Sequence, residues 1–302
     1  MTSYENQRIL VTGGTGSIGS EIVRQLLHHG VKTVRVFSRD ETKQYEMRQR
    51  CDDERLRFLI GDVRDLDRVR RAMDNIDYVF HVAAMKHVPA CEYNPFEAVQ
   101  TNVIGTQNVI TAAAEKGVKT VLAISTDKAA NPTSTMGATK LLAEKLITGA
   151  SRYIKNTKYC CVRFGNILGS RGSIIPTIKN QLAQGKPITI TDKRMTRFFI
   201  TAQKAVEFGL ARALDSPPGK IHVPKMKAML VLDLIEVLME SAPTIPWAIE
   251  DVGIRPGEKL HEELATLAEM ATEEVSITEG NSETATRFTK PEIRELLETI
   301  NA

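Results

Sequence analysis

An acidic and a basic side chain stand together where a run of apolar, β-branched residues ends. The run begins at Thr120, and the stretch that closes it reads Ser125-Thr126-Asp127-Lys128. A carboxyl group and an amine are groups that can donate and remove protons during a reaction. Because a parallel sheet presents its chemistry at the carboxyl ends of its strands, the pair is a candidate acid and base. The alternative is a surface ion pair in a turn.

A second spacing points to the same region. Met136 and Lys140 are four residues apart, and such positions share one face of a helix. The arrangement resembles short-chain dehydrogenases, in which Tyr-x-x-x-Lys follows a hydroxyl residue and the lysine holds the nicotinamide ribose. Met136 occupies the tyrosine position, and a thioether cannot move a proton. Either the protein is catalytically silent or Asp127 and Lys128 have taken over the proton transfer.

A glycine-rich turn follows the first apolar run, Arg8 to Thr12, and precedes an amphipathic segment. Glycines at such a turn let the backbone approach a pyrophosphate, which then sits at the amino terminus of the helix. The strand before and the helix after make this motif more specific than glycines alone. It predicts a dinucleotide site whose residues are Gly13, Thr15, Gly16, Ser17, Ile18 and Gly19.

The end of the second expected strand indicates which dinucleotide binds. Enzymes selective for NAD usually carry an acid there, whereas this chain has Ser38 and Arg39, with Lys43 one helical turn later. A hydroxyl and two cations suit a 2′-phosphate, which favours NADP and leaves NAD possible. Arg39 and Lys43 are alternatively solvated charges at an exposed helix start. After the third strand, Asp62-Val63 is placed for the carboxylate to accept from adenine, or else to cap a helix.

These residues need a scaffold, and the pattern of the first half supplies one. Strands are expected at Arg8–Thr12, Thr33–Phe37, Leu56–Ile60, Tyr78–Val82, Thr120–Ser125 and Tyr159–Phe164, and helices at Ser17–His29, Glu41–Arg50, Leu66–Met73, Pro95–Lys116 and Met136–Tyr153. Such alternation predicts an α/β fold with a Rossmann-type, doubly wound parallel sheet. Residues 1–165 would form the NADP-binding domain.

The pattern changes after about Asn166. A strand at Pro187–Thr191 and helices at Gln203–Leu214 and Leu230–Ser241 predict a smaller C-terminal lobe, residues 166–302, that binds substrate. The boundary is approximate, and the chain can cross back to the first domain. The Glu/Thr/Ser-rich segment Ala271–Thr286 is the best candidate for a mobile stretch.

Composition excludes several classes of protein. The 302 residues, 42% hydrophobic and 25% charged, can form a full core. The net charge of +3 comes without a basic run, so no nucleic-acid binding is expected. Four cysteines without a C-x-x-C pair indicate neither disulfides nor a zinc site. No apolar run approaches the ~20 residues of a membrane span, so we expect a cytoplasmic protein without a membrane segment.

A series of motifs extends from about residue 7 to the last expected helix. Besides the glycine turn they are Phe-Ser-Arg-Asp-Glu-Thr-Lys (37–43), Ala-Ala-Met-Lys-His-Val-Pro (83–89), Glu-Tyr-Asn-Pro (92–95), Ser-Thr-Asp-Lys-Ala-Ala-Asn-Pro (125–132), Arg-Phe-Gly-Asn (163–166), Gly-Ser-Arg-Gly-Ser (169–173), Arg-Met-Thr-Arg-Phe (194–198) and Gly-Ile-Arg-Pro-Gly-Glu-Lys-Leu-His-Glu-Glu (253–263). Together they resemble the UDP-N-acetylglucosamine 4,6-dehydratases of polysaccharide biosynthesis, which are extended short-chain dehydrogenases/reductases. Members with Met at position 136 form a branch of that family. Large members carry an amino-terminal membrane region, which this chain is expected to lack.

The resemblance implies a reaction in three steps on one bound sugar. Carbon 4 of the hexose is oxidised to a ketone by NADP⁺, water is eliminated across carbons 5 and 6, and the hydride returns to carbon 6. The product would be a UDP-4-keto-6-deoxy-N-acetylhexosamine. Inversion or retention at carbon 5, the pathway served, and a GDP sugar in place of a UDP sugar all remain open.

The same resemblance assigns roles to residues. Lys128 would be the base at carbon 5 and Asp127 the acid for the leaving hydroxyl, with Asp127 or Thr126 also helping to take the first proton. A cationic neighbourhood lowers the pKa of a lysine and holds an aspartate ionised, so the two roles compete. The remaining assignments are to the cofactor for Lys140, Asn102 and Ile167, to cofactor and sugar for Lys86, and to the sugar for His87. Asn102 would act by bracing the backbone of the active site.

The second lobe is expected to hold the nucleotide diphosphate. Arginine suits this ligand because its planar fork binds two oxygens at once, although each arginine can instead form a salt bridge between lobes. Lys140 can likewise be an exposed helical lysine, His87 a structural histidine and Asn102 a packing residue. The substrate residues expected in this lobe are Asn166, Arg171, Thr191, Arg197, Arg255 and Glu258.

Two other functions stay open. A nucleotide-sugar 4-epimerase also oxidises carbon 4, but it needs no acid for a leaving hydroxyl, which argues against it in the presence of Asp127 and Lys128. The other alternative is a non-catalytic NADP-binding scaffold that lost its tyrosine. A homo-oligomer is expected from the family, through helix pairs such as Pro95–Lys116 and Met136–Tyr153.

Overall fold

A parallel sheet of eight strands forms the centre of the computed structural model, which describes residues 3–240, 248–272, 275–276 and 281–301. The strand order is β13-β10-β6-β5-β4-β1-β2-β3. The chain proceeds outward from β1 to β3 and then restarts on the other side of β1 with β4, which confirms the doubly wound α/β fold. The strands are β1 (Arg8–Thr12), β2 (Thr33–Ser38), β3 (Leu56–Ile60), β4 (Tyr78–His81), β5 (Thr120–Thr126), β6 (Lys158–Phe164), β10 (Ile221–His222) and β13 (Val275–Ser276).

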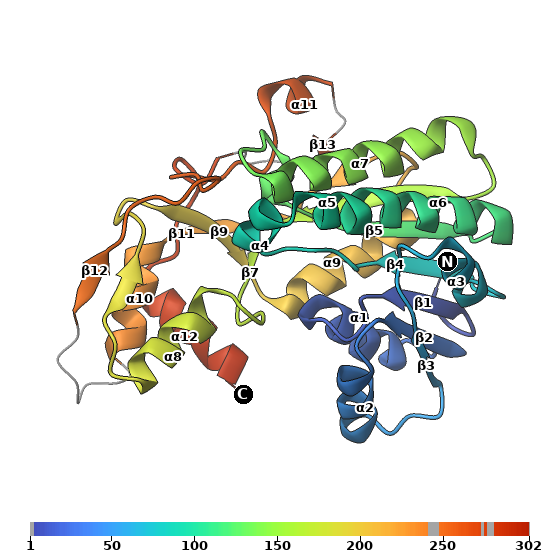
Figure 1. Cartoon of the computed structure of the whole chain (residues 1–302), viewed down its shortest axis with the longest axis horizontal. Helices are drawn as coiled ribbons and strands as arrows, with labels where there is room; N and C mark the ends of the chain where they lie inside the picture. The colour runs from blue at the N-terminus through green and yellow to red at the C-terminus, as the bar shows by residue number, and fades with distance from the viewer. Residues whose placement is uncertain (1–2, 241–247, 273–274, 277–280, 302) are drawn as a thin grey trace.

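Helices cover both faces of this sheet (Figure 1). One face carries α1 (Ser17–His28), α2 (Glu41–Arg50) and α9 (Ala202–Asp215), and the other carries α3 (Leu66–Ala72), α6 (Gly105–Lys116) and α7 (Thr135–Tyr153). Because both faces are covered, strands such as β4 are buried at every residue. The strands and helices expected in the first half of the chain are confirmed to within one residue at nearly every end.

The expected helix Pro95–Lys116 is not uniform. It begins as α5 (Pro95–Ala98), continues as a wider π turn at Val99–Ile104 and becomes α6. A π turn inside a helix shifts the faces that follow it and often occurs at functional sites. Here the turn contains Asn102, which is buried. A short helix, α4 (Val88–Tyr93), precedes it and was not expected from the sequence.

A smaller lobe follows β6. It contains a three-stranded sheet in the order β11-β9-β7 and a parallel pair of β8 and β12, with an apolar core of its own. The chain crosses back from this lobe, because α9, β10 and β13 all belong to the large sheet. The elements of the lobe are β7 (Asn166–Ile167), α8 (Ile174–Ala183), β8 (Ile188–Ile190), β9 (Thr196–Ile200), β11 (Lys227–Leu230), α10 (Val231–Glu240), β12 (Ile249–Asp251) and α12 (Lys290–Asn301). The short helix α11 (Leu267–Ala271) lies outside this lobe, beside β13 of the large sheet.

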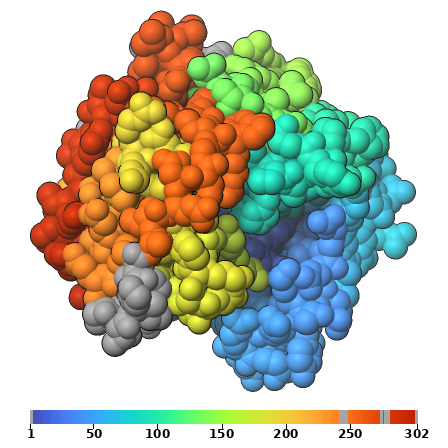
Figure 2. All heavy atoms as spheres, turned by 60° about the vertical axis from the view of Figure 1, so that its left-hand side comes forward, coloured from blue at the N-terminus to red at the C-terminus, as the bar shows by residue number. Residues whose placement is uncertain are grey.

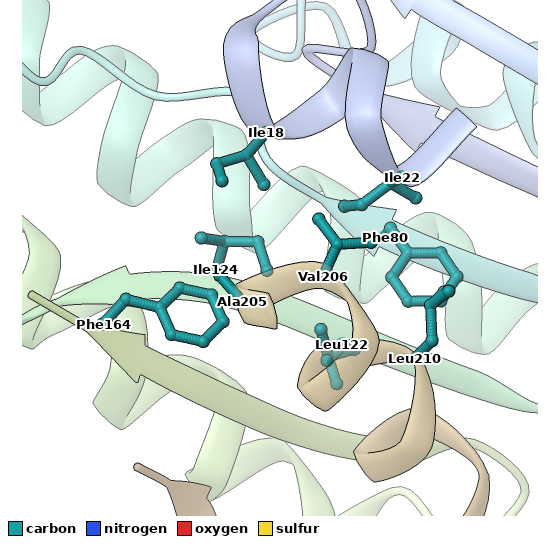
Figure 3. Close-up of a pocket in the computed structure, with 10 residues that line it drawn as sticks. Ile18, Ile22, Phe80, Leu122, Ile124, Phe164, Ala205, Val206 and Leu210 are labelled. Carbon is teal, nitrogen blue, oxygen red and sulfur yellow. The ribbon is translucent and has the colours of Figure 1, made fainter. Parts of the chain in front are cut away.

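The return of the chain through α9 closes the core of the first domain. Figure 3 shows the apolar side chains that meet between α1, β5 and α9, among them Ile22, Leu122 and Val206. This contact leaves no space that a water molecule would fill. Gly209 of α9 also lies in this contact, where it contributes no side chain.

Three expectations concern what the chain lacks. Within the described ranges, no helix is both long and apolar enough to cross a membrane, and no group of His, Cys, Asp and Glu could hold a metal ion. The four cysteines are free. The expected mobile stretch Ala271–Thr286 lies in part outside the described residues, at 273–274 and 277–280, while Val275–Ser276 pairs with β10.

Candidate active site

A cleft of about 840 Å³ lies between the large sheet and the smaller lobe. Figure 2 shows the surface hollowed between the amino-terminal part of the chain and residues of the smaller lobe. The cleft runs along the carboxyl ends of the strands, where an open α/β sheet binds ligands. The expected site residues that line it are Gly13, Thr15, Gly16, Ser17, Ile18, Ser38, Arg39, Lys43, Asp62, Val63, Lys86, His87, Thr126, Lys128, Met136, Lys140, Asn166, Ile167 and Arg171.

The glycine turn forms a cradle that side chains would fill. Gly13 has a φ of +66°, and a Cβ added there would lie 2.8 Å from the backbone nitrogen of Ala83. Gly19 lies behind the turn, where a Cβ would collide with the carbonyl oxygen of Gly13. Gly16 caps α1 without a side-chain hydrogen bond, so the first amides of this helix are left for a ligand. The residues present therefore fit a dinucleotide pyrophosphate.

Cationic and hydroxyl groups gather at the far end of this cradle. The Arg39 side chain is 59% exposed, and its Nη1 lies 3.6 Å from Oδ2 of Asp62. Lys43 Nζ lies 2.5 Å from Oδ2 of Asp40, which caps α2. Burial alone would raise the pKa of Asp62, but hydrogen bonds and charge from Arg64 and Arg39 lower it overall.

The helix-capping alternative for Asp62 is not observed. The residue that caps α3 is Asp65, whose side chain accepts from the backbone N–H of Arg68 at 3.0 Å. The Asp62 carboxylate instead accepts from the backbone and side chain of Arg64 at 3.0 and 2.9 Å. It lies on the cleft wall.

The acidic and basic pair at the end of β5 is a buried cluster and not a surface ion pair. Asp127 is fully buried, and its Oδ1 accepts from Oγ1 of Thr126 at 2.8 Å and from the backbone N–H and Nζ of Lys128, both at 2.9 Å. Its Oδ2 is buried and has no partner among the described residues. Asp127 thus lies behind the cleft wall, while Thr126 and Lys128 reach the cleft itself.

Lys128 also faces groups from the smaller lobe. Its Nζ lies 3.4 Å from Oε1 of Glu262 and donates to Oδ1 of Asn166 at 3.3 Å. Burial alone would lower the pKa of Lys128, but the charges of Asp127 and Glu262 outweigh both this burial and the opposing charge of Arg197, so the pKa is raised.

The start of α7 brings Met136 and Lys140 to the same cleft. Met136 is 3% exposed and packs with Cys91 and Ala98, although it also lines the cleft wall. Lys140 Nζ donates to the carbonyl of Ile124 at 2.7 Å, and burial lowers its pKa. The predicted pairing of these two residues on one helical face is confirmed.

The α7 helix is held at its start by two caps. Ser134 Oγ accepts from the backbone N–H of Gly137 at 3.1 Å. Glu92 of α4 accepts from the backbone N–H and the hydroxyl of Thr135 at 2.6 and 3.1 Å. The helix that carries Met136 is therefore tied to the loop after β4.

That loop and the loop after β7 form the mouth of the cleft. Lys86 Nζ donates to the carbonyl of Arg171 at 2.8 Å, and the Arg171 guanidinium donates to the carbonyl of Thr15. Burial lowers the pKa values of Lys86 and His87. Asn102 does not reach the cleft, because its amide bonds the backbone N–H and carbonyl of Met85 at 2.8 and 3.0 Å.

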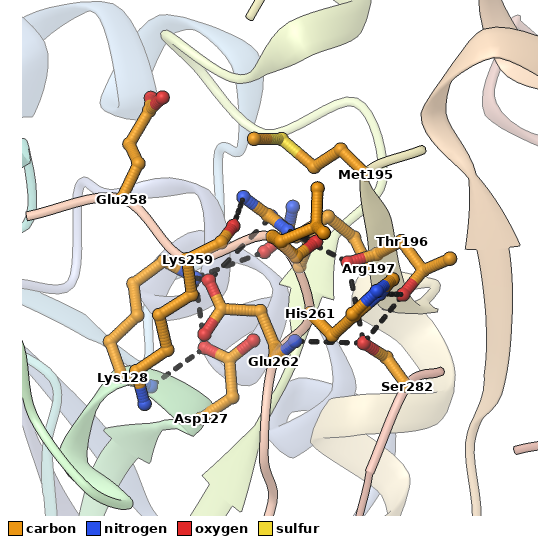
Figure 4. A network of polar contacts seen from close by, with 12 residues as sticks. Asp127, Lys128, Met195, Thr196, Arg197, Glu258, Lys259, His261, Glu262 and Ser282 are labelled. Carbon is orange, nitrogen blue, oxygen red and sulfur yellow. Dashed lines mark hydrogen bonds and ion pairs between the residues drawn. The ribbon is translucent and has the colours of Figure 1, made fainter. Parts of the chain in front are cut away.

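Four residues expected to bind the diphosphate lie elsewhere. Arg197 is buried and donates to the carbonyls of Thr196, Leu260 and Lys259, so its donors hold a chain segment. Figure 4 shows the Glu258 side chain pointing away from this cluster. None of the four lines the cleft in the described structure: Thr191, Arg197, Arg255 and Glu258.

The sequence interpretation overlooked Glu262, which is 3% exposed and faces Lys128. The sequence offered one signal for this residue, an alternation of buried and polar positions with a period of two. Leu260, Glu262 and Leu264 alternate with polar residues, and Leu264 is also buried. A strand-like alternation places the middle residue on the buried side with its apolar neighbours.

Comparison with known proteins matches most of the chain to one family. The model of the family described as "polysaccharide biosynthesis protein" covers residues 9–279. An uncharacterized membrane protein of Methanocaldococcus jannaschii is 51% identical over 86% of this chain and 81% of its own. A UDP-N-acetylglucosamine 4,6-dehydratase (inverting) of Campylobacter jejuni is 45% identical over 86% of this chain and 77% of its own. A UDP-glucose 4-epimerase of Rickettsia rickettsii is 41% identical over 89% and 80%.

Solved structures show the same fold. Pen from Bacillus thuringiensis has a TM-score of 0.93 and 41% identity and covers 99% of both chains. DesIV, a dTDP-glucose 4,6-dehydratase from Streptomyces venezuelae solved with NAD bound, has a TM-score of 0.76 and 25% identity over 84% of this chain and 86% of its own. Both likenesses extend across the large sheet and the smaller lobe.

Proposed function

Since the chain belongs to the polysaccharide biosynthesis protein family, we propose that it is a nucleotide-sugar 4,6-dehydratase acting on UDP-N-acetylglucosamine or a close nucleotide sugar. The observation that supports this most directly is the cluster of Thr126, Asp127 and Lys128 at the cleft, with Asp127 Oδ1 2.9 Å from Lys128 Nζ. An acid and a base at one reacting sugar are what an elimination of water requires.

The cradle of Gly13, Gly16 and the start of α1 would hold a nicotinamide dinucleotide, with Lys140 at its ribose. When bound, this group accepts a hydride from carbon 4 and returns it to carbon 6. The chain's own contribution is to hold the sugar over Thr126 and Lys128. Ser38, Arg39 and Lys43 favour NADP over NAD, because a hydroxyl and two cations suit a 2′-phosphate.

The first proton transfer has to work without a tyrosine. Thr126 Oγ1 lines the cleft and donates to Asp127 Oδ1 at 2.8 Å. The Thr126 hydroxyl can take the proton of the carbon 4 hydroxyl while passing its own to Asp127. Asp127 then holds the proton that the carbon 6 hydroxyl needs to leave as water, returned through the same threonine.

Lys128 is the base for the hydrogen on carbon 5. It can take this proton only as a neutral amine. The neighbouring carboxylates raise the pKa of Lys128, so its ammonium form has to lose a proton to solvent first. Met136 supplies an apolar wall in place of the tyrosine hydroxyl. Two protons move in this scheme. One goes from the carbon 4 oxygen to the departing water. The other goes from carbon 5 to Lys128, and a solvent-exchangeable proton returns to carbon 5 when the hydride adds to carbon 6.

The nucleotide sugar is assigned to the mouth of the cleft. Lys86, His87 and Asn166 line it and offer a cation, an imidazole and an amide to a diphosphate and sugar. Arg171 also lines it, but its guanidinium bonds the carbonyl of Thr15 in the glycine turn, so we assign Arg171 to the dinucleotide side of the cleft. Because Arg197 is engaged with backbone carbonyls, its contribution would be to the shape of this site. We place the enzyme in the cytoplasm, as a homo-oligomer.

The experiment is incubation of the protein with UDP-N-acetylglucosamine and NADP⁺ in heavy water. A net loss of about 17 mass units is expected, which is the loss of water offset by one solvent deuteron at carbon 5. With substrate deuterated at carbon 4, the label should appear at carbon 6. NMR of the same product reports inversion or retention. A product of unchanged mass with an altered configuration at carbon 4 would assign the alternative epimerase activity instead. Replacement of Lys128 by Ala should lower kcat by about 10²-fold or more. Turnover unaffected by it would remove Lys128 as the base, and no turnover of the nucleotide sugar by the parent protein would support the scaffold alternative.

A further inference from the structure

Glu262 brings a second carboxylate to Lys128 from the opposite lobe. Its Oε1 lies 3.4 Å from Lys128 Nζ and 3.6 Å from Arg197 Nε. Its Oε2 is buried and has no hydrogen-bond partner among the described residues. We propose that Glu262 is a positioning residue of the active site, which holds the Lys128 amine between the two lobes and controls when it gives up its proton.

The segment that carries Glu262 is held from several sides (Figure 4). The backbone N–H of Glu262 donates to Oγ of Ser282 at 2.8 Å, and this hydroxyl also bonds Oγ1 of Thr196 at 2.8 Å. Arg197 donates to the carbonyls of Lys259 and Leu260 at 2.8 and 3.1 Å. A carboxylate on such a fixed backbone has little freedom to turn toward water, so its direction toward Lys128 is set by the fold.

The same segment is fastened to the loop after β5. Lys259 Nζ donates to the carbonyl of Ala130 at 2.9 Å, and Thr133 Oγ1 donates to the carbonyl of Gly257 at 3.1 Å. The two chain segments that carry Glu262 and Lys128 are therefore joined by two hydrogen bonds besides the contact of these side chains. This closure explains how a residue of the smaller lobe stays within 3.4 Å of the end of β5.

The charges that face Lys128 determine how readily its amine loses a proton. Asp127 and Glu262 are negative, Arg197 is positive, and the amide oxygen of Asn166 is neutral. With both carboxylates present, the ammonium form is favoured. Loss of the Glu262 charge leaves Lys128 with one carboxylate opposed by one guanidinium, so the amine should lose its proton more easily. This inference rests on the proposed role of Lys128 as the base.

A test that needs no turnover is competitive acetylation. The protein is treated with trace acetic anhydride at pH 8.5, and the acetylation rate of Lys128 is read by peptide mass spectrometry. In Glu262→Gln this rate should rise by about tenfold, since a carboxylate this close shifts a lysine pKa by at least about one unit. The matched control is Glu263→Gln, the next residue, whose side chain makes no contact with Lys128; it should leave the rate unchanged.

A rate for Lys128 that is equal in Glu262→Gln and the parent protein would overturn the proposal. If the glutamine variant does not melt cooperatively, Glu262→Asp serves instead. The aspartate keeps the negative charge but holds it one methylene farther from Lys128. The acetylation rate of Lys128 should therefore rise by less, about two- to fivefold. No rise in that variant would equally overturn the proposal.

The pH profile of kcat separates this proposal from the proposed function. In Glu262→Gln the acidic limb of the kcat profile should move to lower pH, in step with the rise in the acetylation rate of Lys128. The KM for the sugar should change by less than about twofold. If acetylation responds and the acidic limb of the kcat profile does not move, Glu262 does influence the Lys128 amine, but Lys128 is not the base and Glu262 has no part in the reaction. A purely structural role of Glu262 would lower the yield of folded protein without moving either pH dependence.

Discussion

The backbone N–H of Arg171 donates to the hydroxyl of Ser17 at 3.1 Å, across 154 residues of sequence. Ser17 is the first residue of α1, so this bond joins the glycine turn to the loop after β7. The guanidinium of Arg171 also bonds the carbonyl of Thr15. Arg171 thus lies over the dinucleotide cradle, although the sequence motif had suggested a substrate contact.

Removal of this arginine should affect the dinucleotide first. Arg171→Ala is expected to raise the Kd of NADP⁺ by about tenfold, a loss of about 1.4 kcal/mol, since a charge-assisted contact to phosphate is lost. Isothermal titration calorimetry with the dinucleotide alone measures this. Arg194→Ala, an exposed arginine paired with Asp192, is the control and should leave Kd unchanged. If Arg171→Ala weakened the binding of UDP more than that of NADP⁺, Arg171 would instead be a substrate-binding residue.

Arg39 should determine the choice between NADP and NAD. Arg39→Ala is expected to raise the Kd of NADP⁺ by about tenfold or more and to leave that of NAD⁺ within about twofold, because only NADP carries the 2′-phosphate. Titration of each dinucleotide into the parent protein and the variant measures these Kd values. Equal changes for both, or none, would show that Arg39 is a solvated charge.

Two glycines should respond oppositely to an added methyl group. In α9, a Cβ at Gly209 would lie 3.9 Å from Leu122 and 4.0 Å from Val162, so Gly209→Ala should stabilise the protein by about 1 kcal/mol. In α7, a Cβ at Gly137 would collide with the carbonyl of Lys128, so Gly137→Ala should lower both Tm and activity. Thermal melts measure both. A lower Tm for Gly209→Ala would contradict the packing argument.

A buried arginine links three elements behind the site. Arg163 of β6 bonds both carboxylate oxygens of Glu144 on α7, at 3.0 and 2.6 Å, and both of Glu269 on α11, at 3.0 and 2.8 Å. Arg163→Met should lower the free energy of unfolding by about 3–5 kcal/mol, because two buried carboxylates lose their partner. Urea unfolding measures this. The triple replacement Arg163→Met, Glu144→Leu, Glu269→Leu should recover most of the lost free energy of unfolding. If it recovers none, the loss in Arg163→Met comes from poorer packing and not from the unpaired carboxylates.

A buried histidine should make the fold sensitive to acid. His81 bonds Thr12 Oγ1 at 2.8 Å and Thr106 Oγ1 at 3.0 Å, and burial lowers its pKa to about 3. Between pH 6.5 and about 3 only the unfolded chain binds this proton, so stability from this group falls as pH falls through that window. The expected slope is about 1.4 kcal/mol for each pH unit.

Urea unfolding at several pH values tests this contribution. His81→Gln should be less stable than the parent at pH 7 and should show a flatter decline between pH 6.5 and 4. Equal slopes in parent and variant would assign the acid sensitivity to other groups, such as Glu269, whose carboxylate Arg163 holds ionised.

The parts of the site that the sequence predicted are those defined within a few residues. The glycine turn follows β1 directly, and Ser38-Arg39 and Thr126-Asp127-Lys128 each begin at the last residue of a strand. Once the alternation of strands and helices indicates a parallel sheet, strand ends must lie along one edge, and these groups come together. The π turn at Val99–Ile104 was missed because its cause is tertiary: Asn102 has to reach the backbone of Met85.

The smaller lobe was predicted less well for the same physical reason. Arg197 and Arg255 looked alike as candidate phosphate ligands, yet Arg197 turns to backbone carbonyls and Arg255 stays exposed. Nothing local distinguishes the two, since the difference depends on which segments fold back against each one.

By itself the sequence determined the doubly wound sheet, the dinucleotide cradle and the presence of an acid and a base at one strand end, because backbone propensity and periodicity are local. Only the tertiary structure decided that Glu262 faces Lys128 and that Arg171 lies over the cradle. Both contacts join residues more than 100 positions apart, and the protonation of a buried amine depends on whichever charges the fold brings to within a few ångströms.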